Sequence, residues 1–86
     1  MKKLEKLLKA VANKRRLAIL KLLRDKREAS VGELADHLRI SFKATSKHLL
    51  ILSKADILDR EQKSKQVYYY ISTPVSPTVK HILDLL

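Results

Sequence analysis

The chain has 86 residues, enough for one domain with one core and too few for a separate catalytic lobe. It carries 19 Lys and Arg against 9 Asp and Glu, and this formal net charge of +10 points to a polyanionic partner, nucleic acid ahead of an acidic membrane. The chain has no cysteine, which excludes disulfides and thiolate metal sites, and its 45% hydrophobic content excludes a disordered basic tail.

Other classes of protein are disfavoured by what the chain does not contain. No apolar run reaches the roughly 18 residues of a membrane span, and the first eleven residues mix lysines with leucines, unlike a secretory signal. The histidines, acids and serines form no nucleophile–base arrangement by spacing, and one glycine cannot build a phosphate-cradling loop. We therefore expect a cytoplasmic, nucleoid-associated protein that is not an enzyme, uses no cofactor and has no membrane partner.

The amino-terminal third is predicted to form two helices. In the first, the apolar residues share one helical face at spacing i, i+3, i+4, i+7: Leu4, Leu7, Leu8 and Val11. Asn13 is a suitable N-cap for a second helix from Lys14 to Arg24. The apolar residues of this second helix are spread widely enough to bury more than one side.

The next segment has the pattern of a helix-turn-helix. Ser30 and Glu33 fit a capping box, in which each side chain binds a free backbone N–H at the start of a helix, here Val31 to Leu38. After a short turn, Ser41 can cap a longer helix from Phe42 to about Ala55. A helix of eight residues, a tight turn and a longer helix is the helix-turn-helix arrangement.

After Ala55 the apolar period changes from 3.6 to 2. Residues Leu58 to Gln62 and Lys65 to Ile71 are predicted to form two strands about a turn at Lys63-Ser64, and Glu28 to Ser30 could add one β-bridge. Ser76 and Pro77 open a last helix, whose apolar face comprises Val79, Ile82, Leu83 and Leu86. The predicted fold is therefore mainly α with a small β-hairpin wing, in the order α-α-(β)-α-α-β-β-α, and residues 1–86 form a single domain.

The helix from Phe42 has the composition of a helix that reads DNA. Its first two turns carry small or basic donors and one aromatic residue: Phe42, Lys43, Thr45, Ser46 and Lys47. The helix contains no acid, and the next one in the sequence is Asp56. A major groove admits one α-helix, and an acid facing the phosphates would be repelled. The alternative is the solvated face of an ordinary helix.

The basic hairpin suits a wing that straddles a DNA backbone or enters a minor groove. Arg60 precedes the turn, and Lys63 and Lys65 lie near its tip. The alternative is an edge hairpin kept soluble by its lysines. Because the turn lacks glycine, a type I′ turn would be strained, and we expect a longer or more mobile tip.

These stretches together resemble the ArsR-type winged helix-turn-helix repressors of prokaryotes, over about residues 3–71. The similar segments are residues 8–20, 30–38, 40–41 and 44–49, together with Leu52 and residues 67–70. The most specific of them is the Ser-x-His-Leu string at Ser46 to Leu49, which follows Ile40-Ser41.

The resemblance implies a symmetric dimer that binds an imperfect palindrome in double-stranded DNA. It places the dimer interface on the first and last helices, at Leu4, Leu7, Leu8, Ile82, Leu83 and Leu86. The alternative for these apolar stripes is packing within one chain. A domain this small has few places to cover two terminal stripes, so we favour a homodimer.

The resemblance also shows where this chain departs from the family. The thiolate ligands of the metal sensors match Ser30 and Gly32, and the last helix offers only His81 and Asp84, so no metal site is expected and no effector is assigned. Phe42 stands where the family often has Gln. A base-edge hydrogen bond from Gln would thus be replaced by apolar contact of Phe42 with a thymine methyl group, or Phe42 would pack in the core. His48 matches a histidine of the family's recognition helix, for which we expect a phosphate contact or a role in helix packing.

The sequence thus predicts a homodimeric transcriptional regulator, a repressor that occludes its promoter. The residues expected at the DNA are Ser41, Phe42, Lys43, Thr45, Ser46, Lys47, His48, Arg60, Lys63 and Lys65. The alternatives are a winged-helix scaffold for protein interactions and a nonspecific nucleoid or RNA-binding protein that uses the amino-terminal lysines.

Overall fold

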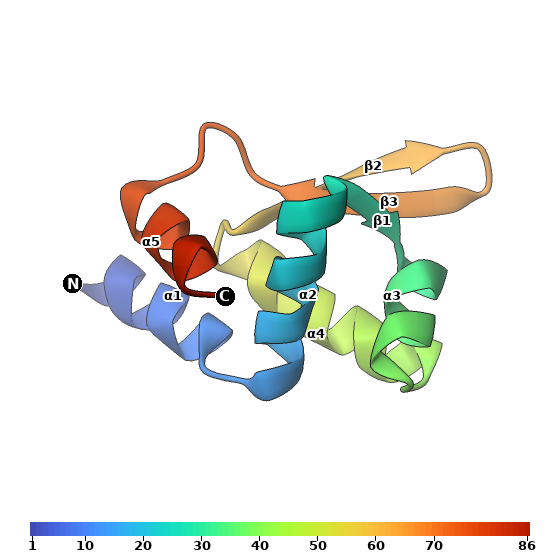
Figure 1. Cartoon of the computed structure of the whole chain (residues 1–86), viewed down its shortest axis with the longest axis horizontal. Coiled ribbons are helices and arrows are strands. Elements are labelled where there is room, and N and C mark those ends of the chain that lie inside the picture. Colours follow the sequence, from blue (N-terminus) through green and yellow to red (C-terminus); the bar gives the residue numbers. More distant parts are fainter.

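The computed structural model describes all of residues 1–86 as five helices and a three-stranded sheet (Figure 1). The elements in chain order are α1 (Lys2–Val11), α2 (Lys14–Lys26), β1 (Glu28–Ser30), α3 (Val31–Leu38), α4 (Phe42–Lys54), β2 (Leu58–Lys63), β3 (Gln66–Ile71) and α5 (Pro77–Leu85). This is the predicted order, and the prediction of a winged helix-turn-helix is confirmed. None of the five helices has the length and apolar character needed to span a bilayer.

Short-range capping explains where most of the helices begin. The Asn13 side chain accepts the backbone N–H groups of Arg15 and Arg16, and Ser76 accepts that of Val79. At α3 the capping box is complete, because Ser30 Oγ accepts the Glu33 N–H and the Glu33 carboxylate accepts the Ser30 N–H. Each such cap contributes about 1 kcal/mol to the stability of its helix, so the residues near each helix start determine where the helix begins.

The three strands form one antiparallel sheet in the order β1-β3-β2. Residues Glu28 to Ser30 make a full strand that pairs with residues 68–70 of β3, more than the single bridge considered above. In β3, Tyr69 is buried and faces the helices, while Tyr68 and Tyr70 face outward.

The wing turn differs from the prediction. Lys63 pairs with Gln66, so the turn lies at Ser64-Lys65, one residue later than expected, and it is a tight two-residue loop. Only Ser64 has a positive φ, of 58°, whereas a type I′ turn requires a positive φ at both central residues. The expectation of a longer tip is therefore wrong, because a single left-handed serine closes the hairpin.

Helix α2 lies at the centre of the core. It contacts every other element except β2, and Ile19, Leu20 and Leu23 are buried in it, as its wide apolar surface predicted. The cluster around it draws on all five helices and the sheet, with Leu34, Leu49, Leu52, Ile57 and Leu58 as its other fully buried aliphatic residues.

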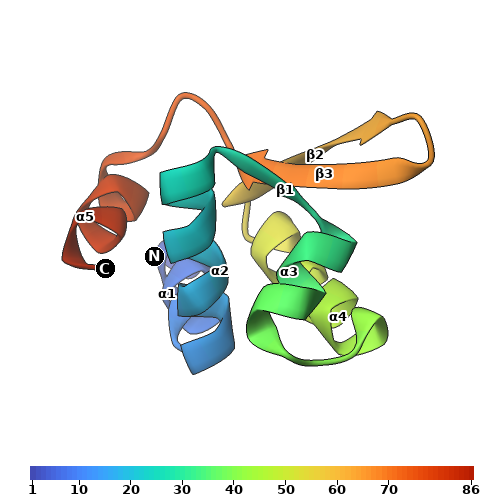
Figure 2. The same cartoon turned by 45° about the vertical axis from the view of Figure 1, so that its right-hand side comes forward.

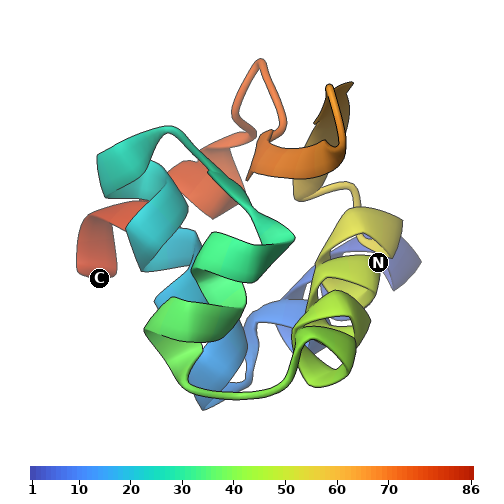
Figure 3. The same ribbon diagram turned by 90° about the vertical axis from the view of Figure 1, so that its right-hand side faces the viewer.

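The wing and the terminal helices lie at opposite ends of the molecule. In Figures 1 and 2 the β2–β3 hairpin extends away from the helices on one side, whereas α1, α5 and both chain termini lie on the other. Viewed from the wing end, α3 and α4 lie in front, below the hairpin (Figure 3). The fold therefore places the wing away from the predicted dimer elements, whereas α4 packs against α1.

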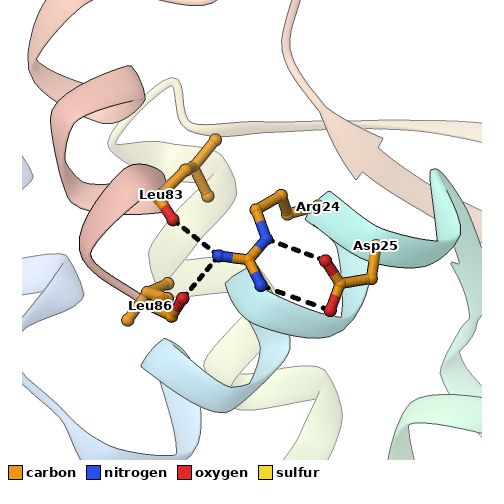
Figure 4. Close-up of polar contacts among 4 residues, drawn as sticks. All are labelled: Arg24, Asp25, Leu83 and Leu86. Carbon is orange, nitrogen blue, oxygen red and sulfur yellow. Dashed lines mark hydrogen bonds and ion pairs between the residues drawn. The ribbon is translucent and has the colours of Figure 1, made fainter.

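Helix α5 is attached to the rest of the chain through α2. The guanidinium of Arg24 on α2 donates to the backbone oxygens of Leu83 and Leu86, at 2.8 and 2.6 Å, and pairs with Asp25 through its other nitrogens (Figure 4). The Leu83 oxygen also accepts the Leu86 N–H, and a cation at this end of the helix complements the helix dipole.

Candidate nucleic-acid interface

The exposed side of α4 carries three lysines that no acid neutralises. Lys43, Lys47 and Lys54 are exposed and form neither an ion pair nor a hydrogen bond within the chain. All five ion pairs involve other cations: Lys9, Arg24, Lys26, Lys63 and Lys80. The α4 surface thus presents uncompensated positive charge, as the absence of acids between Ser41 and Ala55 suggested.

The amino end of α4 is open to an anion. Ser41 Oγ accepts the Ala44 N–H at 3.0 Å and keeps its own hydroxyl hydrogen for another acceptor. The first turn contains no acid, so the partial positive charge at the start of the helix is not cancelled.

Thr45 does not belong to this exposed surface. Its side chain is fully buried, and its hydroxyl donates to the Ser41 backbone oxygen at 2.9 Å. The prediction that Thr45 reads a base is therefore wrong, because the residue lies on the core side of α4. Ser46, one position on, is half-buried, and Lys43 and Lys47 are exposed.

Phe42 lies outside the core, which decides between the two roles considered for it. Its side chain is 62% exposed and lines a hollow of about 460 Å³ between the start of α3 and the wing. Val31 and Val67 supply apolar walls, and Lys65 and Gln66 border the hollow from the wing. Apolar contact with a partner is thus open to Phe42, and core packing is excluded.

His48 faces α2 and is half-buried. Its Nδ1 lies 3.2 Å from Nη1 of Arg16, whose Nε donates to the Ala10 backbone oxygen. Because an arginine can only donate, Nδ1 must be the acceptor and the ring proton sits on Nε2. Burial lowers the pKa of His48, and the positive charges of Arg16 and Arg15 lower it further. The histidine therefore joins α4 to α2 and has one N–H left to donate.

The wing sorts its charges onto two faces, because side chains alternate along a strand. Arg60 pairs across the sheet with the buried Tyr69 and lies on the face toward α4, where it has no acid partner. Lys63 lies on the outer face, where its Nζ binds both carboxylate oxygens of Glu28 at 2.7 and 2.9 Å. It also lies 5.2 Å from the centre of the Tyr68 ring.

This sorting separates the predicted wing contacts. Arg60 is free and borders α4, Lys65 is exposed at the turn, and Lys63 would have to leave Glu28 before it could reach a phosphate. The Glu28 contact raises the pKa of Lys63 and lowers its availability to an external anion.

The sequence reasoning missed two residues of the α4 surface. Lys54 continues the stripe that begins at Lys43 and Lys47, at spacings of four and seven residues, which place all three on one side of a helix. Leu50, at the same angular position, is 52% exposed. The helical period places both on this side of α4, but they lie beyond the first two turns, where base contacts of a recognition helix are expected.

The predicted dimer residues fall into two groups. Leu4 and Leu8 are 41% and 48% exposed, and Leu7, Ile82 and Leu86 are partly buried. Leu83 is different, since it is buried in the chain's own core and only 7% exposed. Its assignment to the dimer interface is wrong for that reason, and the exposed leucine at the end of α5 is Leu85.

No group of three or more His, Cys, Asp or Glu side chains is placed to hold a metal ion. On α5, Asp84 is paired with Lys80 at 3.3 Å, which engages the carboxylate that a metal would need beside His81.

Comparisons with known proteins agree with this geometry. The family model described as "Bacterial regulatory protein, arsR family" matches residues 13–60, from the cap of α2 to Arg60 in the wing. Among curated proteins, the transcriptional activator HlyU of Vibrio cholerae is 42% identical over 80 residues, 93% of this chain and 70% of its own. The transcriptional repressor SdpR of Bacillus subtilis is 34% identical over 67 residues, 78% of this chain and 73% of its own.

Solved structures extend the likeness to the whole fold. The structure of reduced HlyU from Vibrio cholerae superposes with a TM-score of 0.85 over 98% of this chain and 84% of that one. The winged helix-turn-helix DNA-binding domain of Mb0332 from Mycobacterium bovis, described as homodimeric, superposes with a TM-score of 0.82 at 26% identity, over 98% and 74% of the two chains. The chain belongs to the arsR family of bacterial regulatory proteins, which are DNA-binding transcriptional regulators and not enzymes.

Proposed function

We propose that this protein is a sequence-specific regulator that inserts α4 into the major groove of double-stranded DNA. The observation that carries the proposal is the row of exposed, unpaired lysines on α4, Lys43, Lys47 and Lys54, on a helix without acids. Lys43, Ser46 and Lys47, with Phe42, would contact base edges, because the amino-terminal turns of a recognition helix lie deepest in the groove. Ser41, His48, Arg60, Lys63 and Lys65 would contact the backbone.

The functional unit in this proposal is a homodimer on an imperfect palindrome. The exposed leucines of α1 and α5 lie at the end of the molecule opposite the wing, so a partner could cover them without blocking α4 (Figure 2). The homodimeric description of the Mycobacterium bovis domain supports the same arrangement. Two-fold symmetry would place two copies of α4 in successive major grooves.

We further propose that the bound dimer represses by covering its promoter. Occlusion needs only a DNA-contacting and a dimer surface, for which the lysines of α4 and the exposed leucines of α1 and α5 are the candidates. One relative is named an activator and another a repressor, so the relatives do not predict whether this protein lowers or raises transcription. A reporter experiment tests this directly. Placing a selected site over the −10 region of a reporter should lower expression when the protein is made, and raised expression would contradict repression.

The central experiment is selection of bound sites from random duplex DNA, followed by binding measurements on the selected site. Lys47→Ala should weaken binding to the selected site far more than to random duplex, because it removes a base contact. Thr45→Val is the matched control on the same helix: the residue is buried, so affinity for the selected site should stay within about threefold of the wild-type protein.

The outcomes separate the rival functions. Sites without palindromy, together with equal losses for Lys47→Ala on both DNAs, would favour a nonspecific nucleic-acid-binding protein. No duplex binding at low salt would leave the protein-interaction scaffold. For a dimer that contacts roughly six to eight phosphates, log K should fall against log salt with a slope of about −5 to −7.

A further inference from the structure

We propose that the hollow between the last turns of α4 and strand β2 is a seat for one backbone phosphate of the DNA, held by Lys54 and Arg60 above the hydroxyl of Ser53. The inference rests on the proposed function and adds two contacts, Lys54 and Ser53, to the residues expected at the DNA. It also gives Arg60 a specific partner.

The seat is formed by two elements that are adjacent in space. The hollow has a volume of about 220 Å³ and is lined by Leu50, Ser53 and Lys54 from α4, and by Arg60 and Tyr69 from the sheet. Tyr69 and Leu50 provide apolar walls, whereas the two cations come from opposite sides. A phosphodiester combines charged oxygens with apolar sugar edges, and this mixed lining suits both.

The electrostatics of the hollow favour an anion. Neither Lys54 nor Arg60 has an ion-pair or hydrogen-bond partner within the chain. The acids next to Arg60 in sequence, Asp59 and Glu61, point to the outer face of the sheet, since they flank it along the strand. Two uncompensated cations in a shared hollow repel each other, and an anion between them would relieve that repulsion.

Ser53 provides a separate indication. Its Oγ is buried and has no hydrogen-bond partner, the one buried side-chain polar atom in the chain in this condition. A buried hydroxyl without a partner is costly, so a native structure tends to provide one. Because this oxygen is covered, rotation of the Ser53 side chain about χ1 would be needed to turn the hydroxyl toward the hollow, where a phosphate oxygen would be its acceptor.

The position of the hollow identifies the phosphate as part of DNA. In the proposed complex α4 lies in a major groove and the wing lies over the adjacent minor groove, and these two grooves are separated by one sugar–phosphate strand. That strand must pass between α4 and the wing, where the hollow lies. A free phosphate ion would have the same chemistry, and the experiment distinguishes the two.

The test uses the full chain, the selected DNA site and the variants Lys54→Gln, Arg60→Gln and Ser53→Ala. The double variant Lys54→Gln/Arg60→Gln should make the salt slope shallower by about 0.9 per subunit, or about 1.8 per dimer, while the preference for the selected site over random duplex is unchanged. Each single variant should give part of that change, because the remaining cation still faces the same phosphate. Ser53→Ala should weaken binding without altering the slope. Lys21→Gln, an exposed lysine on α2, removes the same charge elsewhere and should leave the slope unaltered.

Replacing single phosphates of the site by uncharged methylphosphonates locates the contact. One position per half-site should weaken the wild-type protein, weaken each single cation variant less, and have no further effect on the double variant. If the double variant Lys54→Gln/Arg60→Gln keeps the wild-type slope while it still binds the site, the inference fails and the proposed function stands. Inorganic phosphate that shifts the NMR signals of the hollow and is not displaced by DNA would assign it to a free anion, and a chain that binds no duplex would overturn both proposals.

Discussion

Glu33 is the residue whose charge matters most to the local stability of the helix-turn-helix. Its carboxylate accepts the backbone N–H of Ser30 and pairs with Lys26 at 2.5 Å, so it joins α2 to the start of α3. The Lys26 contact, followed by the Ser30 N–H, lowers the pKa of Glu33 to about 2. The pKa of the unfolded state is ordinary, at 4.5, so the folded state binds the proton more weakly.

This difference predicts how stability depends on pH. Because the folded-state pKa is lowered, the contribution of Glu33 is fully present above about pH 4.5 and is lost as the pH falls toward 2. Glu33→Gln keeps an acceptor for the Ser30 N–H but removes the charge, and it should lower the free energy of unfolding by about 0.5–1 kcal/mol at pH 7, since the pair is solvent-exposed and screened. Urea denaturation followed by circular dichroism from pH 2 to 7 measures the difference.

The difference between the wild-type protein and Glu33→Gln should vanish near pH 2. Asp36→Asn, on the same helix but without an ion pair, serves as the control for loss of a charge. A constant difference over the whole pH range would show that the loss comes from the cap geometry and not from the charge.

At the scale of single residues, the sequence predicted charge better than orientation. The acid-free composition of α4 correctly indicated a positive surface, because composition does not depend on which way a side chain points. Thr45 was misplaced because burial depends on how α4 packs against the core, and a small polar residue suits either side. Lys63 was expected to contact the DNA backbone, and its ion pair with Glu28 was not foreseen, because Glu28 is 35 positions away and only the pairing of β1 with β3 brings the two together.

Among the elements, α5 is the one most dependent on a single side chain. It contacts only α2, and Arg24 provides its two polar attachments, to the backbone oxygens of Leu83 and Leu86 (Figure 4). Val79 and Leu83 supply its buried apolar contact. The helix is therefore expected to open locally before the rest of the fold does.

Arg24→Ala should loosen α5 selectively. It removes both bonds to the end of the helix, so α5 should open locally more often than in the wild-type protein. Hydrogen exchange of the α5 amides should become faster by roughly tenfold, while the amides of α3 and α4 keep their protection. Lys21→Ala, on the same helix without such contacts, is the control, and a uniform increase over all helices would contradict the local role.

At the scale of elements, the helices were more predictable than the wing turn. Helix starts depend on caps within three residues, so Asn13, Ser30, Ser41 and Ser76 located four of them correctly. The predicted turn of the hairpin was one residue too early, because the register depends on cross-strand pairing and on the positive φ of Ser64. Neither is visible in the alternation of apolar residues.

For the molecule as a whole, the distribution of charge links the terminal helices to the DNA-contacting surface. Lys3 and Lys6 of α1 line one hollow together with Lys54, which also borders the proposed phosphate seat, and Asp56 is the one acid in that hollow. The excess of lysine at the amino end therefore continues the positive surface of α4 and is not isolated from it. This placement favours contacts of α1 with the DNA backbone that flanks each half-site.

Assembly is the remaining property at this scale, and it depends on Leu4 and Leu8. Both are exposed on α1, at the end of the molecule away from the wing, whereas Leu83 is needed for the chain's own core. The double variant Leu4→Asp/Leu8→Asp should therefore give a folded monomer, because it places charge in the dimer interface without creating a cavity in the core. Light scattering should show about half the mass of the wild-type protein, with helical content and melting cooperativity retained.

The same variant should also lose affinity for the full palindrome while it keeps affinity for a half-site, because two linked subunits bind adjacent half-sites with a high effective concentration. Val75→Asp, an exposed apolar residue in the segment before α5, is the matched control and should remain dimeric. Leu83→Asp should instead unfold the chain, since it buries an unpaired charge. A double variant that stays dimeric would move the interface away from α1 and would leave Leu85 and the outer face of α5 as the surface to test.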